Sequence, residues 1–185
     1  MIIHSVMYIT IIFSLIWGRF YFFKINGTSG FIAMLYDSAV TAQIVLTIYS
    51  MLTTEHVPVI FISVSTFVYF LSLSMFWWAV VTARSLDFAF SESVGDIVTT
   101  GPFKIVRHPF YTSYILVWFS STLLFNSPYL WITLIFLVAF YYLSARKEEK
   151  VILKSAYSEE YEKYIQQVGM FLPRIKKWVP SSSEL

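Results

Sequence analysis

The sequence predicts an all-α, multi-pass membrane protein, and three observations support this class. Of the 185 residues, 57% are hydrophobic and only 13% are charged, whereas charged residues make up about a quarter of an ordinary soluble domain. Apolar runs of about 20 residues, the length that crosses a bilayer core as a helix, recur along the chain. All 13 Lys and Arg residues fall in three segments, 19–24, 84–107 and 146–177. The composition therefore excludes a soluble domain and a disordered chain.

The N-terminal half contains three expected spans, at residues 2–23, 31–52 and 59–83. The first run is too long for the apolar core of a signal peptide, and no small-residue cleavage site follows it. We therefore expect it to be retained as a span. Residues 26–30 follow it as a turn, because Asn, Ser and Gly favour loops. Residues 53–58 separate the second and third spans and end in a proline, which suits the first turn of a helix.

The C-terminal half begins with the one sizeable polar loop, residues 85–108. Two further expected spans follow, at 110–125 and 129–143, joined by the short segment 126–128 as a tight helical hairpin. Both spans are short for a full crossing, so we expect one or both to extend past these limits or to cross where the bilayer is thin.

The tail after these spans is expected to be helical. Apolar residues recur there at steps of three and four among charged residues, which is typical of amphipathic helices. They are Leu153, Tyr157, Tyr161, Tyr164, Ile165 and Val168. The pattern predicts one helix over 143–156 that continues the fifth span. A second helix is predicted over 159–168 along the membrane interface, with Ser158 as its N-cap.

The distribution of basic residues predicts the orientation of the spans. Lys and Arg near spans are retained on the cytoplasmic side of a membrane. Five spans with the N-terminus outside place every basic segment on that side, whereas an even number would scatter them. We therefore expect five transmembrane helices, with the large loop and the C-terminal amphipathic helices in the cytoplasm. The chain 1–185 is expected to form a single membrane domain, with three spans in 1–84 and the loop, hairpin and tail in 85–185.

This topology places two polar segments at the same membrane surface. In the first, residues 95–111, Pro109 suits the start of a helix and restricts the backbone of His108 before it. The free amides of that helix end, with Arg107 and His108 beside them, attract an anion such as a carboxylate or phosphate. The alternative is that the basic residues only anchor the helix at the headgroups and that His108 caps it.

The second polar segment, residues 146–150, lies at the end of the fifth span. Arg146, Glu149 and Lys150 share one helical face there. Charges just past a span are usually solvated, so a weak surface pair is the alternative explanation. If the two polar segments meet, they form a pocket with a polar floor and an apolar mouth. Such a pocket suits one polar cofactor and one lipid-like substrate.

Other classes of site are disfavoured. The net charge of +2 is too small to indicate nucleic-acid binding, and the absence of cysteine excludes disulfides and thiolate chemistry. His4, His56 and His108 are too scattered for a metal site. Asp37 lies inside the second span, where a functional role and a hydrogen-bonded structural role are both open.

The second half of the chain resembles the isoprenylcysteine carboxyl methyltransferase and phospholipid methyltransferase superfamily. The marks of that superfamily are a Gly-Pro-aromatic turn, an Arg-His-Pro-x-Tyr segment and a Glu-Glu pair after the next helical hairpin. They appear here at 101–103, 107–111 and 148–149, and the resemblance covers roughly 95–173. It implies an integral membrane enzyme that transfers a methyl group from S-adenosylmethionine to a lipid-like or prenylated acceptor entering from the bilayer. The first candidate acceptor is an isoprenylcysteine-type carboxylate.

The resemblance also implies roles for individual residues. The cofactor contacts would be Asp96, Ile97, Val98, Phe103, His108, Pro109, Phe110, Tyr111 and Glu149. Arg107 or Arg146 would hold the anionic group of the substrate. Two positions depart from the pattern: Gly95 stands where a histidine is common, and Ala145 where an arginine associated with the substrate carboxylate is usual. The second departure leaves the substrate class open.

Three alternatives remain at this point. The acceptor could be a phospholipid amine. Membrane sterol reductases, which bind a nicotinamide cofactor, carry a similar Arg-His-Pro-x-Tyr segment. There it is usually followed by Gly and Glu, whereas Thr112 and Ser113 follow it here. The third alternative is a non-enzymatic membrane subunit whose charged segments only set the topology.

Overall fold

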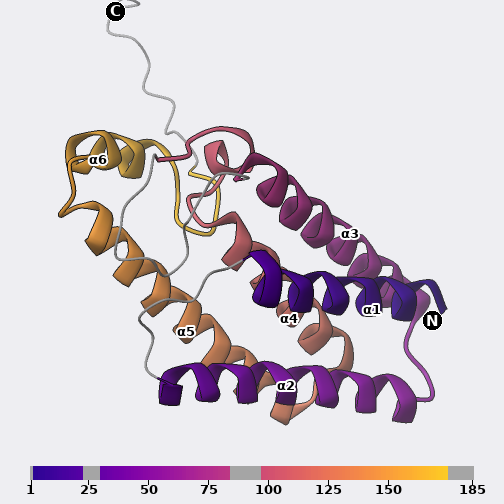
Figure 1. The fold of residues 1–185 in the computed structure, drawn as a ribbon. Helices are drawn as coiled ribbons and strands as arrows, with labels where there is room; N and C mark the ends of the chain where they lie inside the picture. The colour runs from indigo at the N-terminus through magenta and orange to yellow at the C-terminus, as the bar shows by residue number, and fades with distance from the viewer. Residues whose placement is uncertain (1, 23–29, 84–96, 175–185) are drawn as a thin grey trace, which may run out of the picture.

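The structure is a computed structural model that describes residues 2–22, 30–83 and 97–174, and these ranges are helical without β-strands (Figure 1). A π-helical turn, η1, extends the first helix, and a 3-10 turn, η2, precedes α4. The elements are α1 (Ile2–Trp17), η1 (Gly18–Phe22), α2 (Gly30–Thr53), α3 (Val59–Thr82), η2 (Gly101–Lys104), α4 (Pro109–Phe125), α5 (Pro128–Ile152) and α6 (Ser158–Gln167).

Four helices in the described ranges are long and apolar enough to cross a membrane: α1 with η1, α2, α3 and α5. They coincide with the first, second, third and fifth predicted spans, so the multi-pass membrane class is confirmed. The fourth predicted span forms α4, which has 17 residues and a length of about 25 Å. The predicted hairpin is also present, because Asn126 takes a left-handed conformation at φ 47° between α4 and α5.

The tail differs from the prediction in two details. The helix predicted to reach residue 156 ends at Ile152, as part of an unbroken α5. The N-cap of α6 is Tyr157 rather than Ser158. The reason is tertiary: Ile152 packs with Tyr161 and Tyr164 in one cluster, and the chain must turn back after Ile152 for these side chains to meet.

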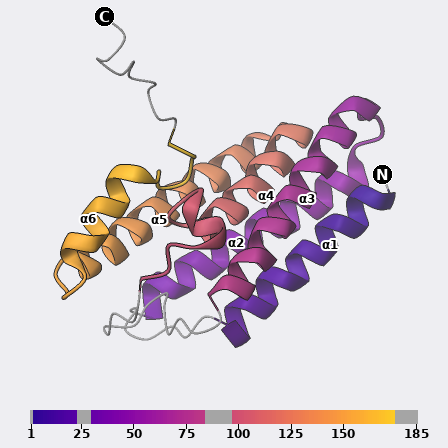
Figure 2. The ribbon, with the colours of Figure 1, turned by 90° about the horizontal axis from the view of Figure 1, so that it is seen from above.

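The central helix of the bundle is α4, which packs against α2, α3 and α5. Figures 1 and 2 show that α5 ends, and α4 begins, at the end of the bundle that carries α6. Figure 2 shows the end of α1 and the start of α2 at this same end. The α4–α5 hairpin turn lies at the opposite end of the bundle. Segments distant in sequence therefore meet where α4 begins.

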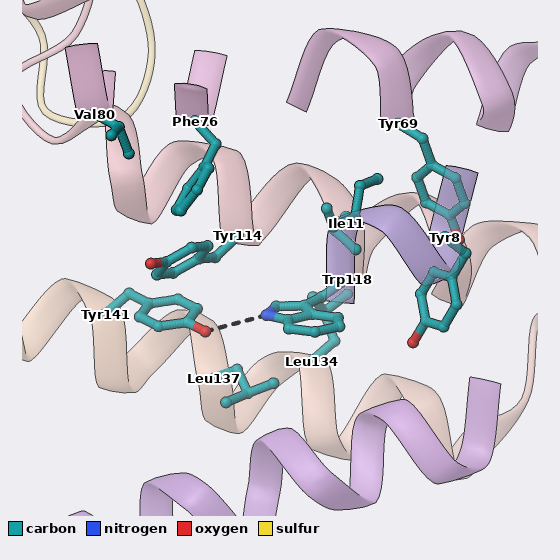
Figure 3. Packing of buried hydrophobic residues seen from close by; sticks show 11 residues of the cluster. Tyr8, Ile11, Tyr69, Phe76, Val80, Tyr114, Trp118, Leu134, Leu137 and Tyr141 are labelled. Carbon is teal, nitrogen blue, oxygen red and sulfur yellow. Dashed lines mark hydrogen bonds between the residues drawn. The ribbon is translucent and has the colours of Figure 1, made fainter. Parts of the chain in front are cut away.

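Aromatic side chains and hydroxyl groups fill the centre of the bundle. Trp118 of α4 is 1% exposed and donates from Nε1 to the hydroxyl of Tyr141, 3.1 Å away (Figure 3). Serine hydroxyls join α3 to α4, as between Ser65 and Ser120 at 2.8 Å. Such short polar side chains let helices approach closely in a membrane, where the hydrophobic effect does not drive helix association.

The polar residue predicted inside the second span has a structural partner. Asp37 forms an ion pair with Arg19, with 3.1 Å between Nη2 and Oδ2. At the other end of the bundle, His4 is buried and stacks on Tyr69. These contacts link η1 to α2 and α1 to α3.

Candidate functional site

The Arg-His-Pro corner and the Glu-Glu pair meet at the end of the bundle where α5 ends. Arg107 contacts Glu149 Oε1 through Nε and Nη2, both at 2.8 Å. His108 Nε2 lies 3.1 Å from the same oxygen. The side chains of Arg107, His108 and Glu149 are each exposed by less than a tenth. The prediction that these two distant segments come together is therefore confirmed.

Three backbone features position the corner. Gly101 at φ 56° brings η2 so close to α3 that a Cβ there would lie 2.6 Å from Thr82 Oγ1. Pro109 starts α4, as predicted. The segment after α6 then runs alongside: the amide of Arg107 donates to Gly169 O at 2.8 Å, and that of His108 to Met170 O at 3.1 Å. The corner is thus held between the bundle and the C-terminal segment.

Glu148 is a site residue that the sequence reasoning did not select. Its Oε1 accepts a hydrogen bond of 2.5 Å from the hydroxyl of Tyr111, and its Oε2 lies 3.5 Å from His108 Nδ1. Consecutive helical residues point about 100° apart, yet both glutamates reach the same imidazole, one at each ring nitrogen. The only sequence signal for this arrangement is the Glu-Glu pair itself.

The electrostatics of this cluster favour a protonated histidine. Burial opposes the charged imidazole, but the hydrogen bonds and charges of Glu148 and Glu149 outweigh it and raise the pKa of His108 above its usual range. With His108 protonated, the two carboxylates are balanced by His108 and Arg107. The charge cluster, defined here as Arg107, His108, Glu148 and Glu149, is then neutral in total.

The raised pKa of His108 predicts a pH-dependent stability. Because the folded state binds this proton more tightly than the unfolded state, the stabilisation is fully present below pH 6.5, the ordinary His value. It is lost as the pH rises through the folded pKa. The thermal midpoint of detergent-solubilised protein should therefore fall over that window, and His108→Gln should flatten the fall. An identical slope in both proteins would contradict the assignment, since His4 and His56 are common to them.

A row of aromatic rings leads from the charge cluster into the bundle. His108 stacks on Tyr111 with ring centroids 5.8 Å apart, and Tyr111 stacks on Tyr141 at 5.4 Å. Phe171, from the segment after α6, meets His108 edge-on at 6.0 Å. Tyr141 and Phe171 were not among the predicted site residues. Their roles arise from long-range packing.

The remaining predicted residues fall into separate groups. Phe103 and Phe110 meet edge to face, 6.4 Å apart, in a cluster against α3 that includes Val98. Ile97 packs instead with the α6 cluster. Arg146 is exposed and forms no hydrogen bond or ion pair within the described part of the chain. Asp96, with Gly95, lies outside the described residues.

The environment of Arg107 does not suit its predicted role, which is to hold the anionic group of the substrate. Besides Glu149, Arg107 donates to Val168 O at 2.5 Å through Nη1. Its side chain is 8% exposed. In this structure its charge is used within the protein, to tie α5 and the C-terminal segment to the corner.

The fold and the site define a multi-pass helical membrane protein with a buried ionic cluster at one end of its bundle. The sequence profile of the phospholipid methyltransferase family matches residues 57–160. The chain belongs to this family, a member of the integral membrane methyltransferase superfamily. The match runs from the residues before α3 into α6 and includes both polar segments of the site. A comparison with curated proteins finds no significant match.

Proposed function

We propose that the protein transfers a methyl group from S-adenosylmethionine to a lipid-like acceptor that enters from the bilayer. The observation that carries this proposal is the meeting of His108 and Tyr111 with Glu148 and Glu149 at one end of a membrane bundle. Family membership favours this function over the reductase and over a non-enzymatic subunit.

The chemistry of the charge cluster fits this cofactor. All the hydrogen bonds that Glu149 accepts through its side chain from the described part of the chain converge on Oε1, so Oε2 has no donor among those residues. A free carboxylate oxygen suits a ribose hydroxyl or an ammonium group. The stacked rings of His108 and Tyr111 suit an aromatic base, and the face of a neutral ring such as Tyr111 suits a sulfonium cation. When bound, S-adenosylmethionine supplies an electrophilic methyl group on its sulfonium.

The residues of the chain then have distinct tasks. His108, Tyr111 and Glu149 bind the cofactor, and Arg107 holds Glu149 in place. The predicted apolar contacts, Ile97, Val98, Phe103, Pro109 and Phe110, exclude water. For a carboxylate acceptor, orientation and exclusion of water account for catalysis, because methyl transfer to a carboxylate requires no proton to be removed.

Two acceptor classes are consistent with this chemistry. An isoprenylcysteine-type carboxylate is ionised at neutral pH and ready to react. A phospholipid amine must first lose a proton, and the family match favours this second acceptor. Assaying methyl transfer to both classes with the purified protein distinguishes them.

We also propose that α4 completes five crossings, with the N-terminus outside and the large loop and tail in the cytoplasm. The confinement of all basic residues to three segments supports this orientation. Because the chain has no cysteine, single cysteines introduced at Glu55 and Lys154 can be labelled from opposite sides of sealed vesicles. Labelling of both from the same side would contradict the orientation.

Binding of S-adenosylmethionine to the purified protein in detergent tests the function directly. Saturable binding is expected, and Glu149→Gln should weaken it by about tenfold or more, since a charged hydrogen-bond acceptor is lost. Lys163→Gln, an exposed change on α6, is the matched control. A folded wild-type protein that shows no saturable binding would retire the proposal, as would preferential binding of NADPH.

A further inference from the structure

Arg19 and Asp37 form an ion pair at the end of the bundle that holds the charge cluster. Nε of Arg19 donates to Oδ1 of Asp37 at 3.3 Å, and Nη2 donates to Oδ2 at 3.1 Å. The two side chains are 31% and 52% exposed. Charged groups within otherwise apolar membrane helices are costly and commonly functional. The pair therefore needs an explanation beyond its modest contribution to stability.

Aromatic side chains connect this pair to the charge cluster. Tyr36, the neighbour of Asp37, has its hydroxyl 3.4 Å from that of Tyr141. Tyr141 stacks on Tyr111, whose hydroxyl donates to Glu148. Arg19 is also close enough to Tyr36 and Tyr114 to interact with them electrostatically. The ion pair and the proposed cofactor site are thus two ends of one continuous set of contacts.

The guanidinium of Arg19 has a free donor edge. Asp37 occupies the edge formed by Nε and Nη2. Nη1 makes no hydrogen bond within the described part of the chain, so the edge formed by Nη1 and Nη2 has no partner among those residues. A planar guanidinium binds carboxylate or phosphate oxygens through two parallel hydrogen bonds. Asp37 orients the group without using this second edge.

The other described arginines lack this combination. Arg107 is buried and bonded to Glu149 and Val168 O. Arg174 donates to the carbonyls of Ile165 and Gln166. Arg146 is exposed on α5, and no contact connects it to the aromatic row.

We propose that Arg19 binds the anionic group of the lipid acceptor, a phosphodiester or a carboxylate, and that Asp37 is its positioning residue. The inference rests on the proposed function in taking the acceptor to be lipid-like. It assigns the contact predicted for Arg107 or Arg146 to a residue outside the motif-bearing half of the chain. The lipid tail would then lie in the bilayer, with its reactive end toward Tyr36 and Tyr141.

Equilibrium binding to the purified full-length protein in detergent tests this site. The anionic probes, so named for their phosphodiester or carboxylate group, are dihexanoylphosphatidylethanolamine, which is zwitterionic overall, and N-acetyl-S-farnesylcysteine. The uncharged controls are dihexanoylglycerol and farnesol. Arg19→Gln should weaken an anionic probe by about tenfold or more. It should leave the uncharged controls and the affinity for S-adenosylmethionine within about twofold. The probe that responds identifies the source of the anionic group.

Two further variants separate binding from a structural role. Arg19→Lys keeps the charge but loses the planar fork, so an intermediate loss is expected. Exchanging the pair, with Arg19→Asp and Asp37→Arg together, restores the ion pair but moves the free edge to α2. The exchanged protein should fold, but its binding of the anionic probe should remain weak.

Several results would overturn the inference. One is full recovery of anionic-probe binding in the exchanged protein. Another is that Arg19→Gln weakens the uncharged controls as much as the anionic probes. The inference also fails if the wild type does not bind the anionic probes, or if Arg19→Gln binds them as tightly as the wild type. A loss caused by Arg146→Gln in place of Arg19→Gln would also overturn it. Failure of the wild type to bind S-adenosylmethionine would instead retire the proposed function, while the probe titrations still decide the role of Arg19.

Discussion

Gly169→Ala is expected to destabilise the protein by about 3 kcal/mol and to abolish binding of S-adenosylmethionine. A Cβ at this position would lie 2.0 Å from the carbonyl oxygen of Leu172, a backbone atom that cannot rotate away. Relief of the clash must move the segment whose carbonyls, Gly169 O and Met170 O, hold the amides of Arg107 and His108. The charge cluster should therefore lose its support together with the fold.

Thermal unfolding and cofactor titration in detergent measure both effects. The matched control is Gly30→Ala at the start of α2, where an added Cβ meets nothing within 4 Å. Its thermal midpoint should equal or slightly exceed that of the wild type, because alanine favours helices. Wild-type stability and cofactor affinity in Gly169→Ala would show that the segment after α6 does not support the site.

Truncating either member of the Arg107–Glu149 pair is expected to cost about 3–5 kcal/mol of folding free energy, because the partner is left as an unpaired buried charge. Both side chains are almost fully buried, at 8% and 6% exposed. The double variant Arg107→Ala with Glu149→Ala should lose much less than the sum of the single losses. The two residues then show a large positive coupling.

The free energy of unfolding in mixed micelles, measured for the four proteins of this cycle, gives the coupling directly. The exposed pair of Arg19 and Asp37 supplies the matched control, since its exposed side chains are screened by solvent. Its coupling should be about 0–1 kcal/mol. Additive losses at Arg107 and Glu149 would mean that the two charges do not depend on each other.

The bundle helices were predictable because hydropathy is a local property. A run of apolar residues long enough to cross a bilayer must satisfy its backbone hydrogen bonds internally, so it forms a helix whatever its neighbours are. The structure accordingly places α2 and α3 within a residue or two of their predicted limits. The end of α5 at Ile152 was missed because it depends on packing against Tyr161 and Tyr164.

The candidate site was predictable only in part. The motif identified His108 and Glu149, and basic-residue counting placed their segments on one surface. Glu148 was missed because neighbouring positions on a helix face different directions, and only the location of His108 between them brings both carboxylates to one ring. Phe171 and Tyr141 carry no signal of their own, since each reaches the site through contacts with distant residues.

The sequence alone therefore determined that this is a helical membrane protein of the methyltransferase superfamily, because span length, charge distribution and short motifs are local features of the sequence. Only the tertiary structure decided how the charges are used. It brought Glu148 and Glu149 to His108, paired Arg107 with Glu149 and left one donor edge of Arg19 without a partner among the described residues. The physical reason is that the environment of a charge depends on which groups surround it in space, and those groups come from distant parts of the chain.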